Sequence, residues 1–216
     1  MNVVLKNHYR IMIWGGIYAS FICIAYRVSV QMQGKDFIGF LYGNLFKLQK
    51  YFWDVSFFFH TYLFLLKKPF SSPMFVARCK QNYFSYVIGY GVQICGFYVA
   101  FTMLLFYGIP IFSGFPVTIN GNIIIQFFHL FSFLFTLYLY YLFLLIKTNR
   151  QMQSLLLVLG TNLFVLMFCH ALESMNHAFA LQMEHLLLKA YPGLAVCTLL
   201  LTRLTVKRKE WLNDEK

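Results

Sequence analysis

Three polar residues near position 170 have the types and the spacing of a metal site. His170, Glu173 and His177 are separated by three and four residues, so they share one face if the helix is continuous. Two imidazoles and a carboxylate can bind zinc or another divalent ion. Polar residues are also expected where an apolar helix leaves a membrane. We favour that second interpretation, because no HExxH motif and no second carboxylate cluster completes a site.

Four further ionisable residues lie inside apolar stretches or at their ends, namely Arg27, Asp54, His60 and His129. An ionisable group within a membrane span is a candidate functional residue. Arg27 and Asp54 can pair at similar depth on neighbouring antiparallel spans, or each can reach water separately. The two histidines lie deeper, where a neutral histidine more commonly hydrogen-bonds to a neighbouring helix. No regular series of acids predicts a proton pathway.

The sequence lacks the motifs of several membrane enzymes and of nucleotide binding. It has no GxSG serine motif and no paired glutamates of the intramembrane CAAX-type proteases. The Gly15-Gly16 pair is not followed by the His and Cys of the small peptide-processing proteases. No G-x-x-x-x-G-K-[ST] loop is present to bind phosphate. We therefore expect no enzyme and no cofactor in this chain, so that any ATP and Mg²⁺ would come with a partner subunit.

Apolar segments must position these residues, and the clearest lies between Lys80 and Lys147. Residues 81–146 contain no Lys, Arg, Asp or Glu, which makes 66 consecutive uncharged residues. A hydrocarbon core about 30 Å thick needs roughly 20 apolar residues per helix, so two spans and a hairpin fit. The whole chain is 60% hydrophobic, above the 45–50% usual for soluble domains. The sequence predicts an integral membrane protein.

Six apolar runs predict an all-α, polytopic membrane protein with a single transmembrane domain over residues 1–216. The expected spans cover about 11–30, 51–66, 84–107, 123–146, 155–171 and 190–206. With a cytoplasmic N-terminus, the inner segments hold 13 of the 18 Lys and Arg residues and the outer segments hold 5. The positive-inside rule therefore predicts that both termini are cytoplasmic. We attribute the formal net charge of +11 to basic residues that set this orientation and in part contact lipid head groups. Their placement in short clusters does not indicate binding of nucleic acid.

The inner connection between the second and third runs carries the most specific pattern. It reads KKPFSSPMFVARCKQNYF over residues 67–84. A serine cap followed by Pro73 favours a short helix that ends near Gln81. Such a helix would present a mixed apolar and basic surface, which can lie on the membrane or enter a groove of a cytoplasmic partner. The residues of this surface are Pro73, Met74, Phe75, Val76, Arg78 and Lys80.

This connection resembles the first inner loop of ABC-2-type permeases, in particular the small six-span forms of Gram-positive bacteria. In that family a proline precedes several apolar residues, an arginine, and a basic or aromatic run that enters the third span. Pro73, the apolar residues 74–76, Arg78 and Lys80 match this outline, whereas residues 79, 81 and 82 depart from the usual small and paired basic residues. Residues 1–10 resemble the family's interfacial elbow helix, and residues 173–189 its outer helical segment.

The resemblance implies the permease subunit of an ABC exporter in a bacterial plasma membrane. Such a subunit forms a homodimer or heterodimer and binds two ATPase subunits through the segment at 73–81. A peptide, antibiotic or lipid-like substrate would move outward between the subunits, along spans one, two and five. Two alternatives stay open: a non-transporting accessory or bacteriocin-immunity protein, and a membrane metal-binding protein or enzyme centred on His170, Glu173 and His177.

Overall fold

The computed structural model describes six stretches of the chain, residues 2–33, 55–66, 83–112, 122–148, 150–175 and 190–205, together with residue 186. Within these stretches the chain is all-helical and contains no strand. The predicted all-α fold is therefore confirmed for this part of the protein. The helices are α1 (Asn2–Gln33), α4 (Ser56–Leu65), α6 (Tyr83–Phe112), α7 (Asn122–Thr148), α8 (Gln151–Met175) and a C-terminal helix (Ala190–Thr205).

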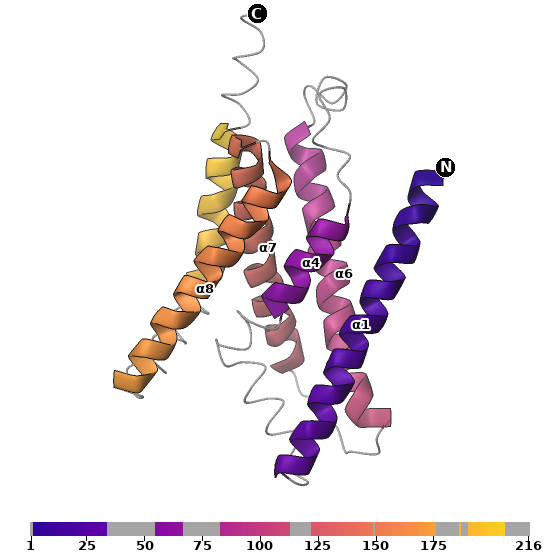
Figure 1. Ribbon diagram of the computed structural model, residues 1–216. Coiled ribbons are helices and arrows are strands. Elements are labelled where there is room, and N and C mark those ends of the chain that lie inside the picture. Colours follow the sequence, from indigo (N-terminus) through magenta and orange to yellow (C-terminus); the bar gives the residue numbers. More distant parts are fainter. Residues whose placement is uncertain are drawn as a thin grey trace, which may run out of the picture.

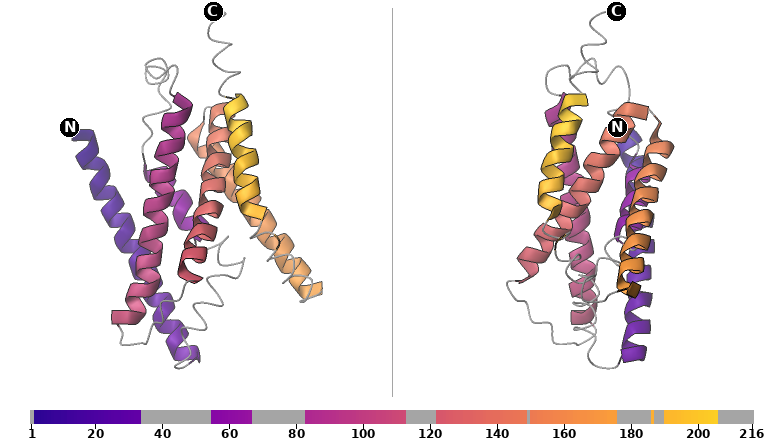
Figure 2. Two further views of the ribbon diagram at one scale, coloured as in Figure 1. Left: turned by 180° about the vertical axis from the view of Figure 1, so that it is seen from behind. Right: turned by 90° about the vertical axis from the view of Figure 1, so that its left-hand side faces the viewer.

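Successive helices run in opposite directions, so the first and last described helices share one end of the bundle. The Asn2 end of α1 and the Thr205 end of the C-terminal helix lie at the top of Figure 1. The Tyr83 end of α6 and the junction between α7 and α8 lie at that same end, as the two views of Figure 2 also show. An even number of alternating helices produces this arrangement.

The five labelled helices form a closed ring of contacts. α1 packs on α4, α4 on α8, α8 on α7, α7 on α6, and α6 returns to α1. The C-terminal helix adds to α7 through Tyr191, whose ring meets Phe133 edge-on at 5.0 Å between centroids. In the right-hand view of Figure 2, α1 and α8 lie on one side, and α6 and the C-terminal helix on the other. The short helix α4 therefore joins α1 to α8 on one side of the bundle.

Two helices are long and apolar enough to cross a membrane by length and composition, Phe84–Ile109 within α6 and Phe127–Thr148 within α7. The other described helices carry shorter apolar stretches, at Tyr9–Ile24, Ser56–Leu65, Gln151–Val165 and Ala190–Thr205. Large apolar side chains are exposed on all six helices, Phe164 and Met167 among them at 71% each. These features support a membrane location for the protein.

The first and third helices extend beyond the spans expected from the sequence. No separate elbow helix exists at residues 1–10, because α1 is continuous from Asn2 and this segment contains neither Gly nor Pro to interrupt it. The second span is described only from residue 55 onward, and α4 is ten residues long. α6 continues through Pro110 to Phe112, past the expected end of the third span near residue 107.

Basic residues are distributed unevenly between the two ends of the bundle. Six Lys and Arg residues lie in the described part of the chain. Only Arg27 lies toward the Gln33 end of α1, and its side chain is exposed. The other five lie at the end that holds the termini, and they are Lys6, Arg10, Lys147, Arg150 and Arg203.

Candidate functional site

Many of the residues singled out from the sequence lie outside the described residues. These include Asp54, His177 and the whole inner surface formed by Pro73, Met74, Phe75, Val76, Arg78 and Lys80. His170 and Glu173 lie on the last turns of α8, where only their positions on the helix are described. Among the described residues, no group of three or more His, Cys, Asp or Glu side chains is placed to hold a metal ion. The metal hypothesis therefore stays untested.

His60 lies in the interior, on the buried face of α4, with 2% of its surface exposed. Its Nδ1 is bonded to the carbonyl oxygen of Ser56, one turn earlier on the same helix. A carbonyl can only accept, so Nδ1 carries the proton and Nε2 is left as an acceptor. Nε2 has no hydrogen-bond partner in the structure. The expected bond across helices is thus replaced by a bond within α4.

The remaining two predicted polar residues lie apart from this histidine. His129 is half-buried on α7, and Arg27 is exposed on α1. The pairing of Arg27 with Asp54 stays a prediction, because Asp54 is outside the described part of the chain. The three described members of this set, Arg27, His60 and His129, therefore lie on three different helices.

A buried junction of α1, α4 and α6 surrounds this part of α4. Three hydrogen bonds cross between these helices. Trp14 Nε1 donates to Thr61 Oγ1 at 3.0 Å, joining α1 to α4. The hydroxyls of Tyr18 and Thr102 share a bond at 3.3 Å between α1 and α6. Tyr98 donates its hydroxyl to the carbonyl oxygen of Val55 at 3.0 Å, joining α6 to the start of α4.

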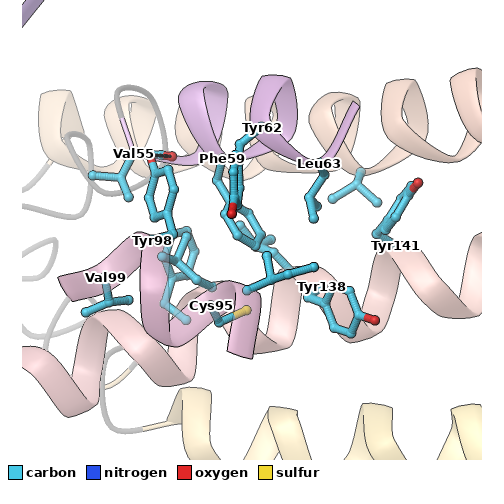
Figure 3. Close-up of a cluster of buried hydrophobic side chains, with 14 of the residues drawn as sticks. Val55, Phe59, Tyr62, Leu63, Cys95, Tyr98, Val99, Tyr138 and Tyr141 are labelled. Atoms are coloured by element: carbon cyan, nitrogen blue, oxygen red, sulfur yellow. Dashed lines mark hydrogen bonds between the residues drawn. The ribbon is translucent and has the colours of Figure 1, made fainter. Parts of the chain in front are cut away.

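Aromatic rings fill the space between these bonds. Trp14 meets Tyr62 at 5.0 Å between ring centroids. Tyr18 meets Phe58 at 4.6 Å. Tyr98 receives Phe59 edge-on at 5.2 Å. These separations are those of favourable ring pairs. Figure 3 shows Phe59 and Tyr62 extending from α4 toward Tyr98 and Cys95 of α6.

A second polar group without a partner lies on the helix that packs against the other side of α4. Asn162 of α8 is 8% exposed, and its Nδ2 makes no hydrogen bond in the structure. His60 Nε2 offers an acceptor and Asn162 Nδ2 offers a donor, on two helices that contact each other. Buried polar atoms without partners are uncommon, since each costs about 1–3 kcal/mol. Two buried polar groups without a partner among the described residues therefore lie on α4 and α8, two helices that pack on each other.

The contact between α6 and α7 is built differently, around Gly91. A Cβ atom on Gly91 would lie 2.1 Å from the Tyr138 ring. The absence of that atom lets the ring lie flat against the α6 backbone. The Tyr138 hydroxyl then donates to the carbonyl oxygen of Val87 at 2.9 Å, one turn before Gly91.

Sequence reasoning missed both junctions, although a signal was present. Trp14 and Tyr18 are four residues apart, as are Tyr98 and Thr102, so each pair shares a helix face. Aromatic residues that carry an N–H or O–H within an apolar helix need a hydrogen-bond partner. The partners come from other helices, which a single sequence does not identify.

Comparison with known proteins yields no relative for this chain. No protein-family model, no curated protein and no solved structure matches it.

Proposed function

We propose that this chain is the permease subunit of an ABC-type exporter, a multi-pass protein of the plasma membrane with both termini in the cytoplasm. A separate ATPase subunit hydrolyses ATP, and a second permease subunit completes the assembly. The substrate is a peptide, an antibiotic or a lipid-like molecule that moves outward. The resemblance of residues 73–84 to the inner loop of ABC-2-type permeases carries this proposal.

The distribution of charge supports the orientation. Five of the six described Lys and Arg residues lie at the end of the bundle that holds both described termini. Cytoplasmic loops carry an excess of basic residues, so this end is the cytoplasmic one. α6 starts from this end with Tyr83, directly after the inner loop. A loop that enters α6 at this end would be within reach of a cytoplasmic ATPase.

The position of α4 suggests how movement of the ATPase can be transmitted to the other helices. α4 precedes the inner loop and packs against both α1 and α8. It is bonded to α1 through Trp14 and Thr61 and to α6 through Tyr98 and Val55. A displacement of the loop by the ATPase would therefore move α4 together with α1, because their side chains are joined. The family resemblance implies that the substrate passes between the subunits along spans one, two and five, which correspond to α1, α4 and α8.

Affinity purification in mild detergent tests this function, with mass spectrometry of the proteins that copurify. We expect a near-stoichiometric ATPase that carries a phosphate-binding loop. Arg78→Glu, within the inner loop, should remove it. Arg150→Glu is the matched control, because Arg150 is an exposed arginine at the same end of the bundle but outside that loop.

One result would contradict the permease proposal, and another would contradict the role of the 73–81 segment in it. Purification of the chain alone, at every detergent strength tried, would favour the non-transporting accessory or immunity protein. Equal loss of the ATPase with Arg78→Glu and Arg150→Glu would mean that charge in general, and not the 73–81 segment, holds the partner. Metal analysis of the purified chain would then decide whether His170, Glu173 and His177 bind an ion.

A further inference from the structure

Polar side chains on the outer surface of the helices mostly bond to their own helix. Ser20 donates to the carbonyl of Gly16 at 2.8 Å, and Thr161 donates to the carbonyl of Val158 at 2.8 Å. Thr198 donates to the carbonyl of Leu194, also at 2.8 Å. A hydroxyl bonded in this way can face lipid at little cost, because its proton is already shared. These residues need no partner outside the chain.

Gln93 of α6 differs from these residues. Its side chain is exposed, and no described residue makes a hydrogen bond with its amide. It lies within one turn of the middle of Phe84–Ile109, one of the two stretches long and apolar enough to cross a membrane. At that depth hydrocarbon offers neither donors nor acceptors, so an unpaired amide is costly. Gln93 therefore requires a hydrogen-bond partner that the described part of the chain does not supply.

The surface around Gln93 suits close approach by another helix. Gly89 and Gly96 lie four residues before and three after Gln93, on the same face of α6, with Ala100 a further turn on. A Cβ atom on either glycine would meet nothing within 4 Å, so this face is open. Small residues beside a polar group are the usual composition of helix contacts in membranes. We call the residues Gly89, Gln93, Gly96 and Ala100 the Gln93 face.

We propose that the Gln93 face binds the same face of a second copy of this chain. Two copies inserted in the same orientation are related by a twofold axis along the membrane normal, which places both Gln93 side chains at one depth. An amide has an acceptor oxygen and a donor N–H₂ group, so two facing glutamines can satisfy each other in a pair of N–H···O bonds. The contact is self-complementary, and a second copy supplies the missing partner.

This inference goes beyond the proposed function, and each can fail separately. The Gln93 face lies opposite the buried face of α6, which carries Gly91 and Cys95. The expectation from the family was pairing along spans one, two and five, which correspond to α1, α4 and α8. Pairing through α6 uses a different surface and leaves α1 and α8 away from the contact. Binding of an ATPase tests the function, whereas contact between two copies tests this proposal.

Disulfide cross-linking in native membranes distinguishes the two arrangements. The background is a variant in which all five cysteines are changed to alanine, at positions 23, 79, 95, 169 and 197. Single cysteines are then placed at Ala100 of the Gln93 face, at Ile17 of α1, and at Phe164 of α8, which are all exposed. We expect a covalent dimer of this chain with Ala100→Cys, which keeps Gln93, and not with Ile17→Cys or Phe164→Cys. Cross-links confined to Ile17→Cys or Phe164→Cys, or an adduct of Ala100→Cys with a different protein, would overturn the proposal.

Energy transfer between two labelled copies in lipid vesicles measures the strength of the contact. Gln93→Leu should weaken dimerisation roughly tenfold, since two interhelical hydrogen bonds are lost. Gln93→Asn keeps the amide and should retain most of the affinity. Gly89→Ile should also weaken the dimer by blocking close approach, whereas Gly160→Ile, at an equally open glycine of α8, should not. Unchanged dimerisation in Gln93→Leu and Gly89→Ile, or a monomeric parent chain, would refute the contact.

Discussion

The contact of α6 with α7 and the contact of α6 with α1 and α4 use the same buried face of one helix, but they are assembled in different ways. On the α7 side, a missing side chain at Gly91 lets one tyrosine ring lie against the backbone. On the α1 and α4 side, large rings fill the gap, and the hydroxyls of Tyr18 and Tyr98 form hydrogen bonds across it. The contact with α7 depends on the missing side chain of Gly91, and the contact with α1 and α4 depends on large aromatic side chains.

The difference shows how a helical bundle compensates for weak hydrophobic association in a membrane. Lipid tails are as apolar as the protein side chains, so helices associate through packing and hydrogen bonds. A glycine contact gains from close packing, and it tolerates no added atom. In an aromatic contact, the stabilisation is distributed over many ring pairs and a few hydrogen bonds. An added atom should therefore destabilise the glycine contact, whereas a removed side chain should destabilise the aromatic contact.

The largest effect is expected at Trp14, in the aromatic contact. Trp14→Ala removes a ring that meets Tyr18, Tyr62, Tyr98 and Phe101, and it removes the bond to Thr61. The cavity and the lost bond should lower the free energy of unfolding by about 3 kcal/mol. Thermal unfolding in detergent measures the change. Ile13→Ala, at the exposed neighbouring position, should have little effect, and an equal loss at both positions would contradict the assignment.

Gly91→Ala should have the next largest effect, in the glycine contact. The added methyl group would lie 2.1 Å from the Tyr138 ring, which must move and release the carbonyl of Val87. Overpacking of this kind lowers the free energy of unfolding by about 2 kcal/mol. The matched control is Gly160→Ala on α8, where nothing lies within 4 Å and helix propensity alone should stabilise the protein slightly.

A double variant sharpens the test of Gly91. Combining Gly91→Ala with Tyr138→Ala removes the ring that the new methyl group meets. The double variant should then lose less free energy of unfolding than the two single variants lose together, because the clash exists only while the methyl group and the ring are both present. Additive losses in thermal unfolding would mean that Gly91 is needed for a reason other than contact with Tyr138.

The smallest effect is expected when a single hydroxyl is removed. Tyr98→Phe and Tyr138→Phe each delete one bond to a backbone carbonyl and leave the ring in place. A loss of about 1 kcal/mol in the free energy of unfolding is expected for each. If Tyr98→Phe proves as damaging as Trp14→Ala, hydrogen bonds rather than ring packing hold the aromatic contact.

The sequence predicted the helices well, because a long uncharged stretch admits few other structures. α6 and α7 fall where residues 81–146 lack charge, and the alternating direction of the helices agrees with the pattern of basic residues. The boundaries were less predictable. The third span was expected to end near residue 107, yet α6 continues to Phe112, with Pro110 in its last turn.

The polar sites were less accessible from the sequence than the helices. His60 was recognised as intramembrane, but its bond to Ser56 depends on a rotamer that composition does not determine. Asn162 was not singled out, and its buried Nδ2 becomes evident only from the packing around α8. Gln93 resembled any polar residue in a long span until its exposure was known. Which face of a helix points outward is decided by all its neighbours together.

The shortness of α4 has a consequence for how the chain is made. Ten residues are too few for a helix to remain stably in a bilayer without neighbours. When α4 leaves the ribosome, α1 already exists and can hold it through Trp14 and Thr61. α8 begins 86 residues after the last residue of α4, from Leu65 to Gln151. At about 5–20 residues per second this is a delay on the order of ten seconds, during which α1 and then α6 alone must retain α4 in the growing protein.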